Sequence, residues 1–446
     1  MKLTAKEIAK ALDLLGVFDE TNITNVEFDS RLVRAGGLFV PLAGAREGHE
    51  FIQQAITNGA VATFWSRPLS EAPSDILVFQ VVDVAKAFQQ LAVYYQSVVA
   101  PRIIAITGSN GKTTTKDMTA GVLSQKYATY KTQGNYNNEL GMPYTILHMP
   151  EETEMLVLEM GMDHAGEIAF LSNLAKPDAA AITIVGEAHL ENFDSRRGIA
   201  QAKMEITEGL KQDGLLIIPA QEALLKEFLP SLTQQIQTFG LTAGEIQGTI
   251  ILEEKERTQF KVGEQVFSIP VLGSYNVTNA LIAYAFGKYF GLTDDEIARG
   301  LASFQLTKNR TEWVKASNGA DLLSDVYNAN PTAMALVLES FGQLDLPGRR
   351  LVVLADMLEL GPDSKAMHAS MAEHISDAYD EIFLFGPEML ALYEKLKNRT
   401  FSLHYFKKEE KSQLLAAIKE SLGSNDSLLL KGSNGMGLAT IVESLQ

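Results

Sequence analysis

The sequence predicts an α/β protein divided into three domains. At 446 residues the chain is too long for one hydrophobic core, because single domains have about 100–200 residues. Apolar runs of strand length alternate with helical patterns along the whole chain. Several runs, such as RIIAI and MLVLE, lack polar alternation, which is typical of strands buried on both faces of a parallel sheet. We place the domains at residues 1–99, 100–308 and 309–446.

The first domain is predicted to be a small α/β unit. Its strand-like runs GLFVPL, VATFW and DILVFQV alternate with helical patterns such as HEFIQQAITNGA. The opening MKLTAKEIAKALDLLG has apolar residues at helical spacing with charges between them, which indicates an amphipathic helix rather than a signal peptide. Pro101 marks the border with the next domain, because the residue before a proline avoids the helical conformation.

The other two domains are predicted to be larger α/β units. The runs RIIAITG, MLVLEMG, AAITIVG and GLLIIPA indicate a central doubly wound, mostly parallel sheet of the P-loop type. Alternating segments such as TQFKVGEQVFSIPV predict a hairpin added to that sheet. The runs DLLSDVY, RRLVVLADM, EIFLFG and SLLLKGSN then repeat the strand–helix rhythm of a Rossmann-like C-terminal domain.

Composition narrows the classes of function. The formal charge of −17 at pH 7 repels nucleic acid and acidic membrane surfaces. The chain has no cysteine, which excludes disulfides, thiolate metal sites and a cysteine nucleophile. No apolar run approaches the ~20 residues that cross a bilayer. We expect a cytoplasmic protein that binds neither nucleic acid nor membrane, and we expect a monomer because no motif requires more.

A glycine-rich turn in the central domain predicts a phosphate site. The segment ITGSNGKTTTKDM follows the run RIIAI and opens a helical pattern, so it gathers free backbone N–H groups and the positive end of a helix dipole. Lys112 adds a mobile positive charge, and the Thr113 hydroxyl can hold Mg²⁺. We predict that ATP phosphates bind to seven consecutive residues: Gly108, Ser109, Asn110, Gly111, Lys112, Thr113 and Thr114.

The same turn resembles a known family. The common Walker pattern would place its first glycine at Ile106, and here the nearer Gly108 takes that role. An ordinary tight strand–helix connection is the alternative. In its shortened form, GSNGKTTT resembles the ATP site of the Mur ligase family, which has folylpolyglutamate synthase as a relative. The resemblance covers essentially the whole chain, with strong motifs in the centre and diffuse ones at both ends.

Three downstream residues with ionisable side chains fit this resemblance. Glu159 ends the run MLVLEMG, where it should point into a ligand crevice, although a polar strand cap explains it equally well. His189 follows the next run and Lys203 lies on the next helix, and either residue alone would be unremarkable. The resemblance implies that all three are catalytic together with Lys112. It implies that Thr113 and Glu159 hold one Mg²⁺, while His189 and a carbamate on Lys203 help to hold a second.

The resemblance also implies further contacts to ATP. Asn138, in GNYNNELGMP, falls at an adenine contact. Asn276 and Asn279 lie in LGSYNVTNALIAYA, which resembles a helix start that usually reads H-N-x-x-N-A in the family, so both are implied to contact the nucleotide. Tyr275 stands in place of the histidine. Helix capping would explain either asparagine equally well. Two residues at the start of the third domain match an arginine that reaches a phosphate and an acid that reaches the ribose: Arg310 and Asp325.

Other segments indicate the substrates. DVYNANPTAM, with VLADMLELG and GNYNN, resembles the branch of the family that adds D-alanyl-D-alanine to UDP-N-acetylmuramoyl-tripeptide, and the DNPR signature of the branch that adds the third residue is absent. DSRLVRAGGLFVPLAG resembles the part that holds the uridine diphosphate, and LKGSNGMG resembles a loop that lines the incoming dipeptide. The resemblance implies substrate contacts at Ser30, Arg46, Asn137, Tyr327, Asn328, Asn330, Lys431 and Ser433. For Ser30 and Arg46, a role as ordinary turn residues is equally plausible.

The resemblance therefore implies an ATP-dependent amide ligase of peptidoglycan precursor synthesis that works through an acyl phosphate. A ligase that adds a single amino acid or glutamate is the alternative within the same chemistry. A P-loop protein that hydrolyses nucleotide as a switch is the alternative from another class, but it leaves His189 and Lys203 unexplained. A catalytically dead binding module is disfavoured because every residue of the implied metal site is present.

Overall fold

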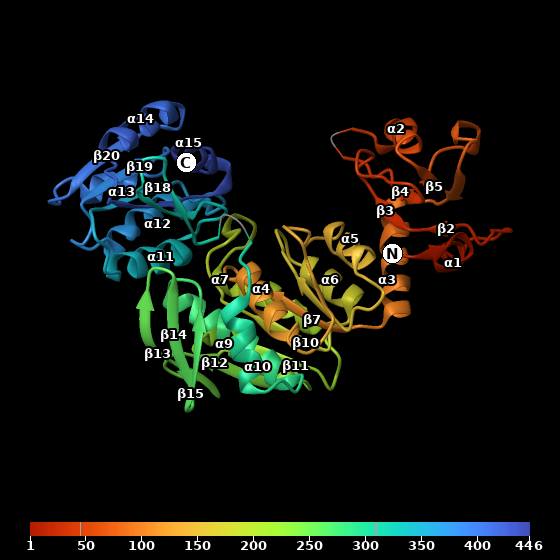
Figure 1. Ribbon diagram of the computed structural model, residues 1–446, viewed down its shortest axis with the longest axis horizontal. Helices are drawn as coiled ribbons and strands as arrows, with labels where there is room; N and C mark the ends of the chain where they lie inside the picture. The colour runs from red at the N-terminus through yellow and green to blue at the C-terminus, as the bar shows by residue number, and fades with distance from the viewer. Residues whose placement is uncertain (45, 308–309) are drawn as a thin grey trace.

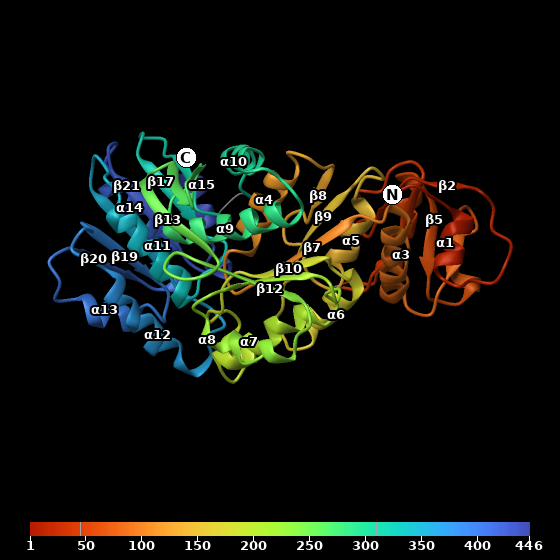
Figure 2. The same cartoon turned by 90° about the horizontal axis from the view of Figure 1, so that it is seen from below.

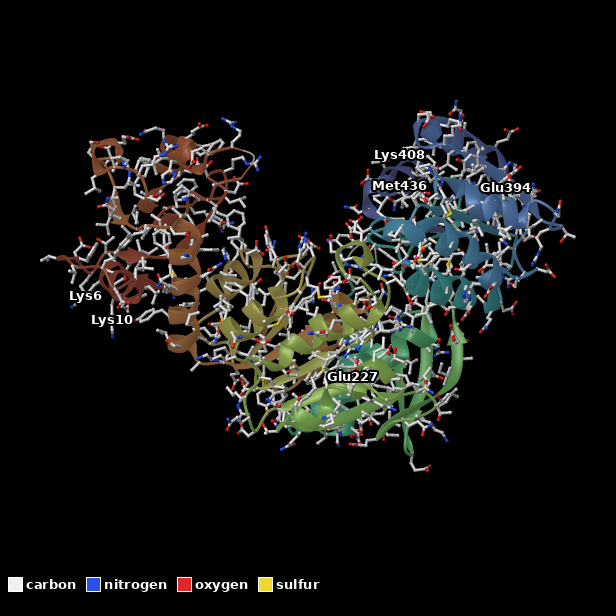
Figure 3. All side chains as sticks on the ribbon, turned by 180° about the vertical axis from the view of Figure 1, so that it is seen from behind. Lys6, Lys10, Glu227, Glu394, Lys408 and Met436 are labelled. Carbon is white, nitrogen blue, oxygen red and sulfur yellow. The ribbon has the colours of Figure 1, made fainter. Side chains whose placement is uncertain are left out.

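The computed structural model describes residues 1–44, 46–307 and 310–446, and it forms three bodies in a bent row (Figure 1). The N-terminal body and the C-terminal body lie at opposite ends of the central body. Lys6 and Lys10 mark the outer part of the first, and Glu394 marks the last (Figure 3). The predicted α/β class with mostly parallel sheets is confirmed. The predicted boundary between residues 308 and 309 lies outside the described residues.

The N-terminal body is a four-stranded parallel sheet with helices packed on it. The strands are β3 (Asn25–Glu27), β4 (Gly37–Phe39), β5 (Ala60–Trp65) and β6 (Leu77–Gln80). The antiparallel pair β1 (Leu3–Thr4) and β2 (Asn22–Ile23) and the helices α1 (Ala5–Ala11), α2 (Ile52–Thr57) and α3 (Val84–Val99) complete it. Helix α1 begins with a capping box, in which the Thr4 hydroxyl accepts from the Glu7 backbone N–H and the Glu7 carboxylate accepts from that of Thr4.

The central body has one sheet of nine strands in the order β15-β14-β13-β12-β11-β10-β7-β9-β8. In chain order these are β7 (Arg102–Thr107), β8 (Thr129–Lys131), β9 (Met155–Glu159), β10 (Ala179–Ile182), β11 (Leu215–Pro219), β12 (Gln235–Gly240), β13 (Ile246–Glu254), β14 (Arg257–Val262) and β15 (Gln265–Ile269). In sheet order, the seven strands from β8 through β9, β7, β10, β11 and β12 to β13 pair in parallel. Strand β14 then pairs antiparallel with both β13 and β15. The predicted parallel sheet with an added hairpin is confirmed.

Helices cover both faces of this sheet, as a doubly wound fold requires. One face carries α4 (Lys112–Leu123), α9 (Ser274–Tyr289) and α10 (Asp294–Ser303), and the other carries α5 (Gly141–His148), α6 (Glu167–Ala175) and α7 (Arg196–Met204), with the short α8 (Ala223–Lys226) beside α7 (Figure 2). Strand β7 supplies Ile104 and Ile106 to the first core and Ile103 and Ala105 to the second. Successive side chains of a strand point to opposite faces of the sheet. Both faces of β7 are buried, so the strand is apolar at successive positions without polar alternation.

The N-terminal body and the central body share one hydrophobic core. A single cluster of buried side chains runs from Phe88 on α3 to Ile146 on α5 and onward beneath the central sheet. At the same junction the Tyr144 hydroxyl donates to Glu27 (2.9 Å), and the Tyr144 ring packs against Phe28 with 4.9 Å between ring centroids. The first two bodies are therefore joined by packing as well as by the chain.

The C-terminal body is a six-stranded sheet in the order β16-β17-β21-β18-β19-β20, parallel except for β16. Its strands are β16 (Glu312–Lys315), β17 (Asp321–Asp325), β18 (Arg350–Ala355), β19 (Glu381–Phe385), β20 (Ser402–Phe406) and β21 (Ser427–Lys431). Its helices are α11 (Pro331–Gln343), α12 (Ser364–Ser370), α13 (Leu390–Leu396), α14 (Lys411–Ser421) and α15 (Ala439–Leu445). Two separate cores, one for each face of the sheet, make up almost all of its buried apolar surface.

Polar contacts hold the chain that leads to the C-terminal body and tie that body to the central one. On α4, the buried Asp117 carboxylate accepts from the backbone N–H (2.9 Å) and hydroxyl (2.8 Å) of Thr307, the last described residue of the central domain. At the β13–β14 turn, Lys255 pairs with Asp321 of β17 (2.6 Å) and lies over the Trp313 ring (4.8 Å).

Among the described helices, none has the length and apolar composition to cross a membrane.

Asp356 joins two loops at the carboxyl edge of the C-terminal sheet. It follows β18, is 2% exposed, and accepts from the backbone N–H of Met389 (3.0 Å). Burial raises the pKa of Asp356 to about 6, although hydrogen bonds from the Met389 and Glu388 backbone oppose the rise. The ionised carboxylate is therefore less stable in the folded chain than in the unfolded chain.

We expect this group to make the C-terminal domain more stable as the pH falls. Its folded pKa lies above the unfolded value of 3.8, so folding disfavours ionisation by about 3 kcal/mol above pH 6, and this penalty disappears as the pH falls from 6 toward 4. The Asp356→Asn protein should be more stable than the parent at pH 8, and its free energy of unfolding should depend less on pH. The chain has two tryptophans, so urea unfolding followed by Trp313 fluorescence in a Trp65→Phe background reports on this domain. Equal pH slopes for the two proteins would contradict the assignment.

Candidate functional site

The turn between β7 and α4 lies tightly against two neighbouring segments. Gly108 has φ +152° and Gly111 has φ +79°, a region that side chains disfavour. A Cβ on Gly108 would collide with the hydroxyl of Thr183, which follows β10, and a Cβ on Gly111 would collide with the amide of Asn279 on α9. Only glycine therefore allows the loop to pack this closely.

Hydroxyl groups hold the loop to the segment after β10. The Ser109 hydroxyl accepts from the Gly186 backbone N–H (2.9 Å) and donates to the carbonyl of the same residue (3.2 Å). The Thr183 hydroxyl donates to the Asn110 carbonyl. The first N–H groups of α4 have no partners within the helix, and they lie at the positive end of its dipole. The loop is thus rigidly held in a form suited to an anion.

Two lysine amines lie near one another beside this loop. Lys112 donates to the Gly108 carbonyl (2.8 Å), and burial lowers its pKa, with the Glu159 carboxylate opposing the shift. Lys203 on α7 is 2% exposed, and its pKa is lowered well below the usual value, first by burial and then by the charge of Lys112. The charge of Lys112, at the end of the phosphate loop, therefore acts on the buried amine of Lys203.

Glu159 ends β9 in a buried position next to the loop. Its Oε1 accepts from the Asn137 amide (2.8 Å), and its backbone N–H donates to the Thr132 hydroxyl (3.1 Å). Its Oε2 is buried without a hydrogen-bond partner in the structure. A buried carboxylate oxygen without a partner is unfavourable, so this atom is suited to a bound cation.

His189 lies across from the loop in an unusual backbone conformation. Its φ is +59°, a region that few residues other than glycine adopt. Its Nδ1 lies 2.6 Å from the carboxylate of Glu359, in the C-terminal domain, and 3.3 Å from that of Asp163. Burial and the charges of Lys112 and Lys203 lower the pKa of His189 against the effect of these two acids.

Two cavities meet at the phosphate loop. The larger has a volume of 930 Å³, and the predicted residues that line it are Ser109, Asn110, Gly111, Lys112, Thr113, Asn137, Asn138, Glu159, His189, Arg310, Tyr327 and Asn328. The smaller has a volume of 470 Å³, and the predicted residues that line it are Asn110, Gly111, Thr114, Asn276, Asn279, Arg310, Asp325, Asn328 and Lys431. Four residues belong to both cavities, so a molecule bound at the loop can extend into each.

The smaller cavity has the character of a nucleoside site. It lies at the carboxyl ends of β10, β11 and β12, with Phe239, Tyr275 and Val337 among its apolar walls. Asn276 and Asn279 form a buried chain, in which the Asn279 amide donates to Asn276 (3.1 Å) and accepts from the Thr115 hydroxyl (3.2 Å). Both asparagines thus also connect α9 to α4.

The larger cavity contains donors that fit a hard cation. Over residues 1–44, 46–307 and 310–446, no three His, Asp or Glu side chains are arranged to hold a metal ion. The Thr113 hydroxyl and the unpartnered Glu159 oxygen nevertheless lie in one cavity with His189. Oxygen donors of this kind, completed by substrate oxygens and water, are the set that Mg²⁺ prefers.

Three residues predicted to contact substrate are already occupied inside the C-terminal domain or at its border. Lys431 donates to Asp325 (2.6 Å) and to the Asn328 carbonyl (3.1 Å), and it lines the smaller cavity. The Ser433 hydroxyl accepts from the Leu358 backbone N–H (2.9 Å). Asn330 is 1% exposed and bonds to the phosphate loop. These side chains are therefore paired within the fold, and their predicted contacts to substrate stay predictions.

Three other predicted residues also have contacts within the fold. Asn138 lines the larger cavity, away from Asn276 and Asn279, and its side chain accepts from the Gly141 backbone N–H (2.8 Å) at the start of α5. In the N-terminal domain the Ser30 hydroxyl donates to Gln54 (2.7 Å). Arg46 is exposed and lies 3.8 Å from Glu50.

Three acids close to the site were not among the predicted residues. Asp163 and Glu359 flank His189, and Glu187 accepts from the Thr332 hydroxyl (2.7 Å) and backbone N–H (3.2 Å) at the start of α11. Glu187 and Asp163 lie shortly after apolar runs, as Glu159 ends one, so the same pattern could have identified them. Nothing in the sequence pattern brings Glu359 to His189.

Models of one family match most of the chain. The Mur ligase family catalytic domain matches residues 22–96, the Mur ligase middle domain matches residues 106–287, and the Mur ligase glutamate ligase domain matches residues 309–434.

Relatives and solved structures agree over the full length. The UDP-N-acetylmuramoyl-tripeptide–D-alanyl-D-alanine ligase of Bacillus subtilis is 41% identical over 96% of this chain and 94% of its own length. The crystal structure of MurF from Acinetobacter baumannii has a TM-score of 0.88 at 30% identity, covering 100% of this chain and 99% of that one. The MurF ligase of Thermotoga maritima in complex with ADP has a TM-score of 0.82 at 27% identity, covering 95% and 97%.

Gly108→Ala should weaken nucleotide binding. The new side chain meets the Thr183 hydroxyl in a disfavoured backbone conformation, so the loop must shift, and we expect the ADP dissociation constant to rise by at least about tenfold. Isothermal titration calorimetry measures this directly. Gly263→Ala is the control, because Gly263 also has a positive φ but a Cβ there meets nothing within 4 Å. Unchanged ADP affinity in Gly108→Ala would show that phosphates bind elsewhere.

Proposed function

The chain belongs to the Mur ligase family, and we infer that it uses ATP to add D-alanyl-D-alanine to UDP-N-acetylmuramoyl-tripeptide in peptidoglycan precursor synthesis. The observation that carries this function is the phosphate loop facing Glu159 and His189 across one cavity, in a chain similar over its whole length to ligases of this activity. The single-residue ligases remain the alternative within the same chemistry.

The reaction needs positioning and charge more than a protein nucleophile. The terminal carboxylate of the peptide attacks the γ-phosphorus of ATP, and ADP leaves as an acyl phosphate forms. The amine of D-alanyl-D-alanine then attacks the acyl carbon, the bond to the phosphate oxygen breaks, and the amine loses a proton. Lys112 and the N–H groups of α4 would neutralise charge on the transferred group. The absence of cysteine agrees with this mechanism.

We propose that Mg²⁺ is held by Thr113 and Glu159, and that a second ion is held by His189 and a carbamate on Lys203. Bound Mg²⁺ would neutralise the phosphate oxygens and the attacking carboxylate. The unpartnered Oε2 of Glu159 supports the first site. The burial of Lys203 supports the second, because CO₂ adds only to a neutral amine and converts it into a carboxylate that suits a hard cation.

We propose that the three domains divide the binding work. The N-terminal domain, residues 1–99, would hold the uridine diphosphate, the central domain, residues 100–308, would hold ATP, and the C-terminal domain, residues 309–446, would hold the dipeptide. Closure of the outer domains would exclude water from the acyl phosphate. We further propose a monomer in the cytoplasm, where ATP is available.

The acceptor amine should decide turnover. With ATP, Mg²⁺ and UDP-N-acetylmuramoyl-tripeptide, we expect phosphate release with D-alanyl-D-alanine and little with L-lysine, diaminopimelate or L-glutamate. The mass of the product should correspond to one added dipeptide. Equal phosphate release without any amine would favour a nucleotide-hydrolysing switch instead, and turnover with L-glutamate alone would favour a folyl-type ligase.

Lys203→Ala should nearly abolish turnover, and formate or acetate should restore part of it by supplying the missing carboxylate. A readout independent of activity is the ¹³C NMR carbamate signal after equilibration with ¹³C-bicarbonate, which should be present in the parent and absent from Lys203→Ala. Lys211→Ala is a control, because Lys211 is exposed and pairs with Asp178 (2.6 Å). Full activity of Lys203→Ala would rule out the role.

A further inference from the structure

Two asparagine side chains from different domains form a reciprocal pair at the phosphate loop. The Asn110 amide donates to Asn330 (3.0 Å), and the Asn330 amide donates to Asn110 (2.8 Å). Asn110 belongs to the loop, whereas Asn330 immediately precedes α11, which lies on the side of the C-terminal domain that faces the central one (Figure 1). We name this pair the asparagine clasp.

The orientation of the clasp is determined by the helix start. Asn330 is the N-cap of α11, and its Oδ1 also accepts from the Ala333 backbone N–H (2.9 Å). An N–H donor requires an oxygen, so the Asn330 amide cannot be turned around without losing the cap. Its Nδ2 must then face Asn110. Asn330 is 1% exposed, so loss of a partner in the clasp would leave a buried polar group unpaired.

The clasp changes what Asn110 can offer a ligand. Its side-chain oxygen and nitrogen both bond to Asn330, and its carbonyl accepts from Thr183. The clasp therefore leaves Asn110 its main-chain N–H and one Nδ2 hydrogen to offer a phosphate. The clasp thus commits the Asn110 side chain to a contact that shapes the loop, and the predicted contact of Asn110 to nucleotide stays a prediction.

Two further contacts between the domains flank the clasp. Glu187 binds the backbone N–H and hydroxyl of Thr332. Glu359 binds His189, and its carbonyl accepts from the Glu191 backbone N–H (3.0 Å). The C-terminal domain therefore docks directly on the segments that carry the site, and the clasp is the contact that reaches the phosphate loop itself.

We propose that Asn330 is a positioning residue that acts through Asn110, so that docking of the C-terminal domain holds the phosphate loop in its nucleotide-binding shape. Each event then favours the other, because coupling between two binding equilibria is reciprocal. This proposal rests on the proposed role of the loop in binding ATP phosphates.

The test is a double-mutant cycle on ADP affinity with Asn110→Ala and Asn330→Asp. Aspartate keeps the helix cap and can still accept from the Asn110 amide, but it has no N–H to donate to the Asn110 oxygen. The substitution therefore removes one of the two clasp bonds while the cap is kept. We expect Asn330→Asp to raise the ADP dissociation constant about tenfold in the parent and to have little further effect in Asn110→Ala. Asn330→Ser, which also caps but is too short to reach Asn110, should behave like Asn330→Asp.

A second measurement uses reciprocity. In the parent, ADP should slow amide hydrogen exchange in residues 326–334, and this protection should be lost in Asn330→Asp. The KM for ATP should rise in this variant while the KM for D-alanyl-D-alanine stays near the parent value.

Additive effects in the cycle, or unchanged ADP affinity in a folded Asn330→Asp protein, would overturn the clasp while leaving the effect of Gly108→Ala, and with it the proposed function, intact. A failure of both Gly108→Ala and Asn330→Asp to change ADP affinity would instead remove the nucleotide from this loop.

Discussion

The placement of a partly buried lysine and a fully buried lysine, Lys112 and Lys203, at one loop determines the character of this protein. Lys112 and Lys203 lie close enough that the charge of Lys112 lowers the pKa of Lys203. Two amines enclosed together are unfavourable unless one is neutral or an anion joins them. The glycine turn and the start of α4 provide a place for such an anion, and the cavities on either side decide what it is attached to.

Much of the fold followed from the sequence because it depends on local patterns. Apolar runs such as RIIAI predicted strands buried on both faces, and the change to alternation before Pro270 predicted the β13–β15 antiparallel segment. The strand–turn–helix junction predicted the phosphate loop, whose glycines do have positive φ values.

The site was predicted less completely, because many of its polar side chains pair over long distances in the chain. Asn330 meets Asn110, 220 residues earlier, and Lys431 meets Asp325, 106 residues earlier. Neither pairing produces a periodicity or a motif. A resemblance to ligand-binding positions therefore assigned Asn330 and Lys431 to substrate, whereas their partners in the fold are other side chains. Tyr275, which stands where a histidine was expected, lines the smaller cavity.

The continuous core between the first two bodies has a consequence for how this protein can be divided or recombined. Phe88 on α3 and Ile146 on α5 belong to the same cluster of buried side chains, so residues 1–99 made alone would expose an apolar face to water. The C-terminal body has its own cores and loses few apolar neighbours on separation. A chimaera that exchanges the last domain between relatives should fold more readily than one that exchanges the first, since the first domain cannot be transplanted without the helix it packs against.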